Sequence, residues 1–87
     1  MRMQPLDHEN LFMGLAIELA RAAYDNDEVP VGAVIVQKRN NEVISAFSNQ
    51  MRKQRSSIAH AEMLAIQKAN KIIDNERLIG CEMFVSL

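Results

Sequence analysis

The chain has 87 residues, so it forms one domain at most, and a chain this short buries a smaller share of its surface than a typical domain. Its residues are 48% hydrophobic and 24% charged, which is an ordinary globular composition and argues against a disordered segment or a disulfide-built miniprotein. The formal net charge of −1 gives no overall electrostatic signature for nucleic acid or anionic membranes, so any such contact must be local.

The cysteine content and the apolar segments indicate a compartment. Cys81 is the single cysteine, so no internal disulfide can form, and we expect a reducing compartment, with the cytoplasm as the default. The N-terminal segment has no long apolar core behind Arg2, and no later stretch approaches the roughly 20 apolar residues of a membrane helix. We therefore expect neither export nor membrane insertion.

The first half of the chain predicts a helix followed by a β-hairpin. Leucines and alanines recur at three- and four-residue steps over residues 8–25, which is typical of an amphipathic helix, and Asp7 is its expected cap. The nearly continuous β-branched run "VPVGAVIVQ" (29–37) predicts a strand covered on both faces. A turn follows, with Asn40 and Asn41 able to take left-handed backbone angles, and "VISAFSN" (43–49) predicts the second strand.

The second half predicts a loop, a helix and a strand. Residues 50–57 are polar and basic, which favours a loop, and residues 58–73 carry an apolar face that predicts a largely buried helix. That face consists of Ile58, Ala61, Ala65, Ala69 and Ile72. Asn75 and Gly80 are turn residues before a final strand, "EMFVSL" (82–87). A right-handed crossover through this helix would set the second and third strands parallel in one sheet, which makes the fold class α/β.

One histidine and one glutamate lie two residues apart in "IAHAEMLAI". On a regular helix such positions point about 200° apart, so His60 and Glu62 cannot face one point from mid-helix, which excludes the His/Glu pair of a helix-borne metalloprotease site. In an irregular first turn, with Ser56 or Ser57 as a cap, both side chains can converge at the helix N-terminus. There a neutral imidazole can bind a metal and a carboxylate can move protons.

Four stretches together carry a resemblance to a known family. "VPVGAVIV", then Ser48 and Asn49, "AHAEMLAI" and "CEMFVSL" resemble the zinc-dependent cytidine and nucleoside deaminase superfamily, and are most similar to bacterial tRNA adenosine deaminases. The resemblance covers nearly the whole chain. It implies that residues 1–87 are a partial CMP/dCMP-type deaminase domain, the N-terminal portion (helix-strand-strand-helix-strand) of a three-layer fold with a mixed sheet.

The resemblance also implies a set of site residues. His60 and two cysteines would hold zinc, which activates a water, and Glu62 would be the catalytic group that moves protons to the ring nitrogen and the leaving ammonia. Asn49 would hydrogen-bond the base or its sugar, the backbone at Ala61 would contact the base, and Val31 would line the pocket. The implied reaction is the deamination of a nucleobase, most closely adenosine to inosine at the wobble position of tRNA.

The sequence departs from the family pattern at its last residue. The family continues the final strand into Glu-Pro-Cys-x-x-Cys, whereas this sequence stops at Leu87, and Cys81 precedes the strand. A catalytic zinc needs three protein ligands, so we expect the isolated, truncated chain to bind zinc poorly and to be inactive.

Other interpretations stay open at this point. The family also includes enzymes that act on a free base or nucleoside, such as guanine or cytosine. The chain could instead be a non-catalytic truncated product that serves only as a binding or assembly partner. Taken alone, His60 fits a hydrogen-bonded histidine at a helix start, and Glu62 an ordinary first-turn acid. For intact relatives, the expected partners are the tRNA anticodon loop or a small nucleobase, and the expected assembly is a homodimer.

Overall fold

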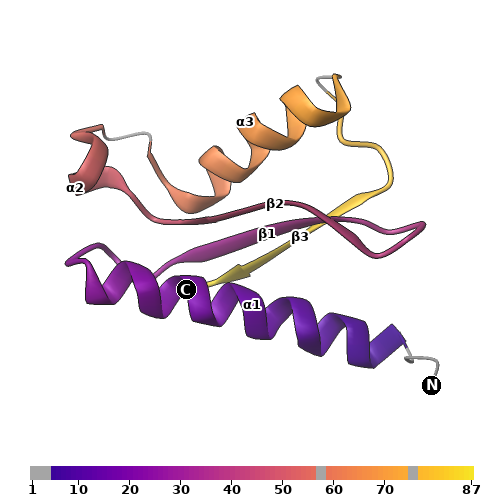
Figure 1. The fold of residues 1–87 in the computed structure, drawn as a ribbon, viewed down its shortest axis with the longest axis horizontal. Coiled ribbons are helices and arrows are strands. Elements are labelled where there is room, and N and C mark those ends of the chain that lie inside the picture. The colour runs from indigo at the N-terminus through magenta and orange to yellow at the C-terminus, as the bar shows by residue number, and fades with distance from the viewer. Residues whose placement is uncertain (1–4, 57–58, 75–76) are drawn as a thin grey trace.

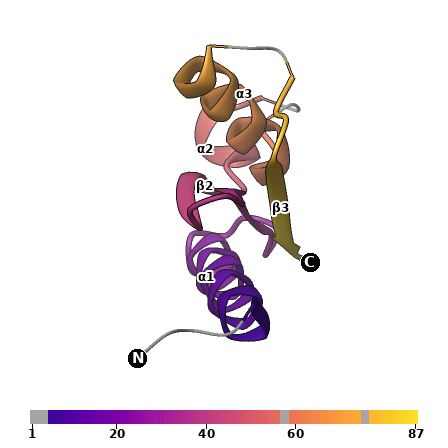
Figure 2. The same ribbon diagram turned by 90° about the vertical axis from the view of Figure 1, so that its right-hand side faces the viewer.

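The structure, a computed structural model, describes residues 5–56, 59–74 and 77–87. Its elements are α1 (Pro5–Asp25), β1 (Gly32–Gln37), β2 (Glu42–Ser48), α2 (Met51–Gln54), α3 (Ala61–Ile73) and β3 (Cys81–Ser86). The strands form one sheet in the order β2-β1-β3, with α1 below it and α3 above it (Figure 1). The end-on view separates these layers (Figure 2). The predicted order of helix, strand, strand, helix and strand is therefore confirmed, with α2 as an addition.

The central strand, β1, pairs antiparallel with both of its neighbours. Gly32 lies opposite Ser48 of β2 and opposite Ser86 of β3, so these three residues form one row across the sheet. Because both pairings are antiparallel, β2 and β3 run parallel to each other on either side of β1, in the direction that the crossover argument predicted. The carboxyl ends of β2 and β3 consequently lie at the same end of the sheet.

β1 is buried on both faces, as its β-branched sequence predicted. All residues from Gly32 to Val36 are buried. Val34 and Val36 pack with Phe12 and Ala16 of α1. On the other face, Ala33 and Ile35 pack against α3 through its three fully buried alanines, Ala61, Ala65 and Ala69. Successive side chains of β1 thus point alternately into two separate cores, one against α1 and one against α3.

Close approach of α1 to β1 depends on a glycine. A Cβ atom added to Gly32 would lie 2.7 Å from the Leu19 Cβ and 2.8 Å from the Ala20 backbone nitrogen, and it would also overlap the Ala16 carbonyl oxygen. These neighbours include helix backbone, which cannot rotate away. The glycine is therefore needed for packing.

Two predicted element starts in the first half are wrong. α1 begins at Pro5 rather than at residue 8, so Asp7 lies inside the first turn instead of capping it. A proline is tolerated there because the first turn needs no N–H from it, and an acid in this turn suits the helix dipole. β1 begins at Gly32 rather than Val29, because the Val31 N–H donates to the Val29 carbonyl (2.8 Å) and closes a tight turn at Pro30.

The second half departs from expectation in three places. The predicted loop contains the short helix α2, and α3 begins only at Ala61. The prediction that most of this helix is buried is wrong: Ile72 is 53% exposed, because α3 presents only its narrow alanine stripe to the sheet. Gly80 and Asn41 take the left-handed angles expected of turn residues. The predicted roles of Ser57, Ile58 and Asn75 lie outside the described residues.

Over residues 5–56, 59–74 and 77–87, no helix is long and apolar enough to cross a bilayer.

Candidate active site at the N-terminus of α3

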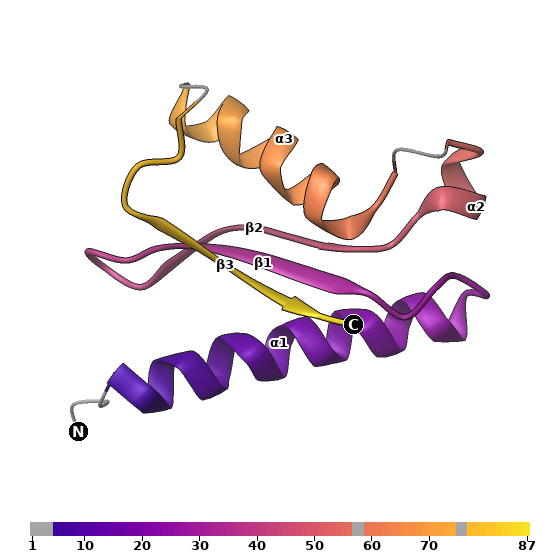
Figure 3. The ribbon, with the colours of Figure 1, turned by 180° about the vertical axis from the view of Figure 1, so that it is seen from behind.

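The site residues predicted from the sequence lie together at one end of the sheet. Asn49 follows β2 directly, Val31 precedes β1, and His60 and Ala61 open α3. Seen from behind, α2, the start of α3 and the end of α1 all lie at this end of the molecule (Figure 3). In open α/β sheets, ligands bind outside the carboxyl ends of strands, and the carboxyl ends of β2 and β3 lie here.

Asn49 is hydrogen-bonded to two of these residues, Val31 and Ala61. It is only 2% exposed, and its side-chain Oδ1 accepts a hydrogen bond from the Ala61 backbone N–H (3.1 Å). Its own backbone N–H donates to the Val31 carbonyl (3.0 Å). The first bond satisfies a donor that the start of α3 would leave unpaired, and it does not use the two donors of the Asn49 amide NH₂ group. The residues predicted to contact a base are thus held together by Asn49 itself.

His60 is the N-cap residue of α3. Its backbone is extended (φ −73°, ψ 145°), and its carbonyl accepts the first hydrogen bond of the helix, from the Leu64 N–H (2.9 Å). The imidazole makes no capping hydrogen bond and is half-buried. The N-cap is therefore His60 itself and not Ser56, because the helix begins later than predicted. His60 lies outside the regular helix, which is the condition under which its side chain and that of Glu62 can converge.

Glu62 lies in the first turn of α3 and is half-buried. Its Oε1 atom is buried and has no hydrogen-bond partner among the described residues. Buried carboxylate oxygens are normally paired, because leaving one unpaired costs free energy. An oxygen of this kind, next to a helix start, is the sort of group that a ligand would satisfy.

The described residues do not by themselves fit a zinc ion. Across residues 5–56, 59–74 and 77–87, no group of three His, Cys, Asp or Glu side chains is placed to hold a metal. Cys81 pairs with Gln37, at the opposite end of β1 from Gly32, so it cannot join His60. His60 supplies one nitrogen, whereas catalytic zinc needs three protein ligands.

Sequence reasoning missed Glu28. This residue is 7% exposed, and its carboxylate accepts hydrogen bonds from the backbone N–H groups of Arg52 (2.9 Å) and Lys53 (2.8 Å). The Arg52 N–H is the main cause that holds the pKa of Glu28 below its usual value of 4.5; burial opposes this, and the Lys53 N–H and the Arg52 charge add to the lowering. No local signal marked Glu28, since an acid in "DNDE" fits an ordinary turn.

An open pocket of about 480 Å³ lies beside this carboxylate. Its walls include Asn26 at the end of α1, Glu28, Asn49, and Arg52 and Lys53 of α2. Arg52 and Lys53, which are exposed, lie at the rim of this pocket, and the pocket shares Asn49 with the candidate site. The guanidinium group of Arg52 makes one hydrogen bond within the protein: its Nη1 donates to the Asp27 carbonyl (3.0 Å).

The chain is similar in sequence and fold to known deaminases. The tRNA-specific adenosine deaminase of Aquifex aeolicus (strain VF5) is 41% identical over 76 residues, which cover 87% of this chain and 49% of that protein. A structure solved in a study of A-to-I editing by tRNA:A34 deaminases at the wobble position of transfer RNA matches with a TM-score of 0.83 and 38% identity, over 90% of this chain and 58% of that one. Guanine deaminase from Bacillus subtilis matches with a TM-score of 0.83 and 29% identity, over 97% and 50%.

The extent of these matches defines what is shared. The chain spans about half the length of the Aquifex relative. The family profile described as the cytidine and deoxycytidylate deaminase zinc-binding region matches residues 6–87, which include β1, Asn49, His60, Glu62 and β3. The chain belongs to the cytidine and deoxycytidylate deaminase family.

Proposed function

We propose that this chain contributes the His60–Glu62 part of the active site of a zinc-dependent hydrolytic deaminase that converts adenosine to inosine at the wobble position of tRNA. The observation that carries the proposal is the start of α3, where His60 is a non-helical N-cap and the nearby Glu62 has a buried Oε1 without a partner among the described residues. The likeness to a tRNA-specific adenosine deaminase supports the choice of substrate.

Glu62 is the proton carrier in this proposal. Hydrolytic deamination moves one proton from the attacking water to the ring nitrogen and a second from the resulting hydroxyl to the amino group, which leaves as ammonia, and a single carboxylate can perform both transfers. The half-buried carboxylate of Glu62, with an unpaired oxygen, suits this task because a solvated carboxylate would exchange its proton with bulk water instead. Asn49 would donate from its NH₂ group to an acceptor on the base or sugar, beside the Val31 wall and the Ala61 backbone.

His60 is one zinc ligand in this proposal, and the others lie outside the described residues, in a longer protein or on another chain. A bound zinc would supply an activated water. We accordingly expect the isolated 87-residue chain to hold little zinc and to be inactive. The proposed place of action is the cytoplasm, and the proposed assembly of the full-length protein is a homodimer.

A second candidate is deamination of a free purine base such as guanine. The Bacillus subtilis guanine deaminase structure matches this chain with the same TM-score as the tRNA:A34 deaminase structure, over a larger share of the chain. The two candidates differ in the substrate that must enter: one is a base presented by an RNA loop, and the other is a free base.

The test is a chimaera in which residues 6–87 replace the matching half of the Aquifex enzyme. We expect this protein to bind zinc and to form inosine on an anticodon stem–loop with adenosine at the wobble position, and to leave guanine unchanged. Its Glu62→Gln variant should keep zinc and lose at least about a hundredfold in rate. A folded, zinc-loaded chimaera that leaves adenosine intact would sink the proposal, and xanthine formation from guanine would favour the second candidate.

The isolated chain provides the complementary measurement. Elemental analysis of the purified chain and of His60→Ala should find zinc well below one ion per chain in both. Stoichiometric zinc that disappears in His60→Ala would contradict the expected inactivity, because this chain would then complete a metal site by itself or by self-association.

A further inference from the structure

The segment between β2 and α3 is held by a side chain that is distant in the sequence. α2 follows Asn49 closely, and its own N-cap residue, Gln50, makes no side-chain capping hydrogen bond. The Glu28 carboxylate accepts the Arg52 and Lys53 N–H groups instead, at 2.9 and 2.8 Å. A helix start leaves such donors unpaired, and here one carboxylate satisfies two of them, with one oxygen each.

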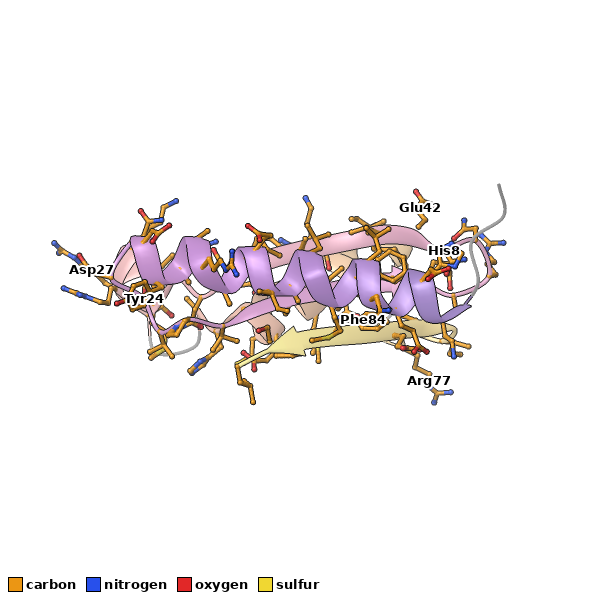
Figure 4. All side chains as sticks on the ribbon, turned by 90° about the horizontal axis from the view of Figure 1, so that it is seen from below. His8, Tyr24, Asp27, Glu42, Arg77 and Phe84 are labelled. Carbon is orange, nitrogen blue, oxygen red and sulfur yellow. The ribbon has the colours of Figure 1, made fainter. Side chains whose placement is uncertain are left out.

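Glu28 is itself anchored to the end of α1. Its backbone N–H donates to the Ala23 carbonyl (2.9 Å), and the Asp27 N–H donates to the Tyr24 carbonyl (3.1 Å). Asp27 takes a left-handed angle (φ 60°) that turns the chain at this point. Tyr24 and Asp27 mark this end of α1 in Figure 4. The carboxylate therefore extends from a helix end that packs on the sheet, which restricts its freedom to follow α2.

The residues immediately before α2, Asn49 and Gln50, are hydrogen-bonded to the candidate site and to the segment that enters it. Gln50 donates its N–H to the Ala59 carbonyl (3.0 Å), immediately before His60. Asn49 is fixed by its backbone to Val31 (3.0 Å) and by its Oδ1 to the Ala61 N–H (3.1 Å). Asn49 is thus linked to Val31 on one side, and in the chain it lies two residues before α2, the helix that Glu28 caps. A shift of α2 would therefore move the Asn49 side chain.

We propose that Glu28 is a positioning residue, which fixes α2 and thereby holds the Asn49 side chain against the Ala61 N–H at the start of α3. The effect on a bound base rests on the proposed function, whereas the coupling between Glu28 and Ala61 does not. The substitution Glu28→Gln tests this directly: it replaces one accepting oxygen with an NH₂ group that cannot accept, while it keeps the size of the side chain.

Hydrogen exchange of the ¹⁵N-labelled 87-residue chain measures the coupling. In Glu28→Gln we expect the Ala61 amide to exchange about tenfold faster, with the Arg52 and Lys53 amide resonances displaced. The Leu64 amide, which donates to His60 in the same helix, is the internal reference and should change less than about twofold. Glu28→Asp keeps the carboxylate and should restore part of the protection, and the exposed Glu9→Gln is the matched control.

Two results would overturn the inference. One is an Ala61 exchange rate in Glu28→Gln that equals the rate in Glu9→Gln. The other is equal acceleration of Ala61 and Leu64, because that pattern would mean general destabilisation rather than positioning. If Glu28→Gln does not fold, the same comparison in Glu28→Asp decides.

The chimaera separates this inference from the proposed function. Glu28→Gln should raise the KM for the anticodon stem–loop about tenfold and leave kcat within about twofold, since Glu28 orders a binding residue and touches no reacting atom. An unchanged KM would contradict the inference even if inosine forms. A parent chimaera that forms no inosine would overturn the proposed function, and the exchange data on Ala61 would still decide the role of Glu28.

Discussion

At one end of the sheet, where Gly32 lies opposite Ser48 and Ser86, polar side chains are buried and bonded to backbone groups. We call this the site end, and Asn49 (2% exposed) and Glu28 (7% exposed) belong to it. At the other end, the hairpin end, Gln37 lies opposite Glu42 and Cys81. Figure 4 shows Asp27 beyond one end of α1, and Glu42 and Arg77 toward the other.

The hairpin end keeps its polar contacts in solvent. Lys38 and Glu82 form an ion pair at 3.4 Å with side chains 63% and 38% exposed, and Asn40 bonds Glu42 on the surface. A solvated pair loses most of its attraction to water and salt, whereas a buried acceptor that loses its donor stays unsatisfied. The two ends therefore differ in how much a single substitution should cost, although both lie on the same three strands.

The largest effect is expected for Gly32→Ala at the site end. Its new Cβ would overlap the backbone of α1, so we expect a loss of about 3 kcal/mol or more in the free energy of unfolding, measured by urea denaturation. Gly14→Ala in α1 is the matched control, since an added Cβ there meets nothing within 4 Å. It should stabilise the chain by up to about 1 kcal/mol. Equal midpoints for the two variants would contradict the close packing of α1 on β1.

Asn49→Ala should come next. It removes the acceptor of the Ala61 N–H at a buried position, and we expect a loss of about 1–3 kcal/mol in the free energy of unfolding. Asn40→Ala, which removes an exposed asparagine at the hairpin end, should cost less than about 1 kcal/mol. If urea denaturation gives the same loss of unfolding free energy for both substitutions, burial would not be what distinguishes the two ends.

The pH dependence of stability should report Glu28. Its folded pKa lies below the unfolded value of 4.5, so its stabilisation is complete above that value and is lost as the pH falls through the folded pKa. The difference in unfolding free energy between the wild-type chain and Glu28→Gln should therefore shrink when the pH falls below 4.5. Urea melts at a series of pH values measure it, with Glu9→Gln as control. A difference that stays constant down to acid pH would argue against an ionised cap.

The smallest effect is expected for the Lys38–Glu82 pair. A double-mutant cycle with Lys38→Gln and Glu82→Gln should give a coupling below about 0.5 kcal/mol that diminishes in high salt. A coupling above about 1 kcal/mol would mean that the hairpin end also contains a fixed electrostatic contact, and the contrast with the site end would weaken.

Only the His60–Glu62 pair of the candidate site could be predicted from local sequence. Their spacing indicated that both side chains can face one point only from an irregular helix start, and the structure places His60 there as the N-cap. Asn49 was found only through the family resemblance, since an asparagine after a strand also fits a turn. Glu28 could not be found, because the donors that make it important are 24 and 25 residues away and meet it only after α1 and α2 have packed.

The sequence by itself determined the order of the elements, the buried character of β1, the hairpin and the family. These follow from side-chain periodicity, turn residues and motifs, which act over a few neighbouring positions. Only the tertiary structure decided where α3 begins, that α2 exists, that Ile72 stays exposed and that Glu28 caps α2. Helix caps and exposure depend on which distant surface lies opposite a residue, and that information is absent from any short stretch of chain.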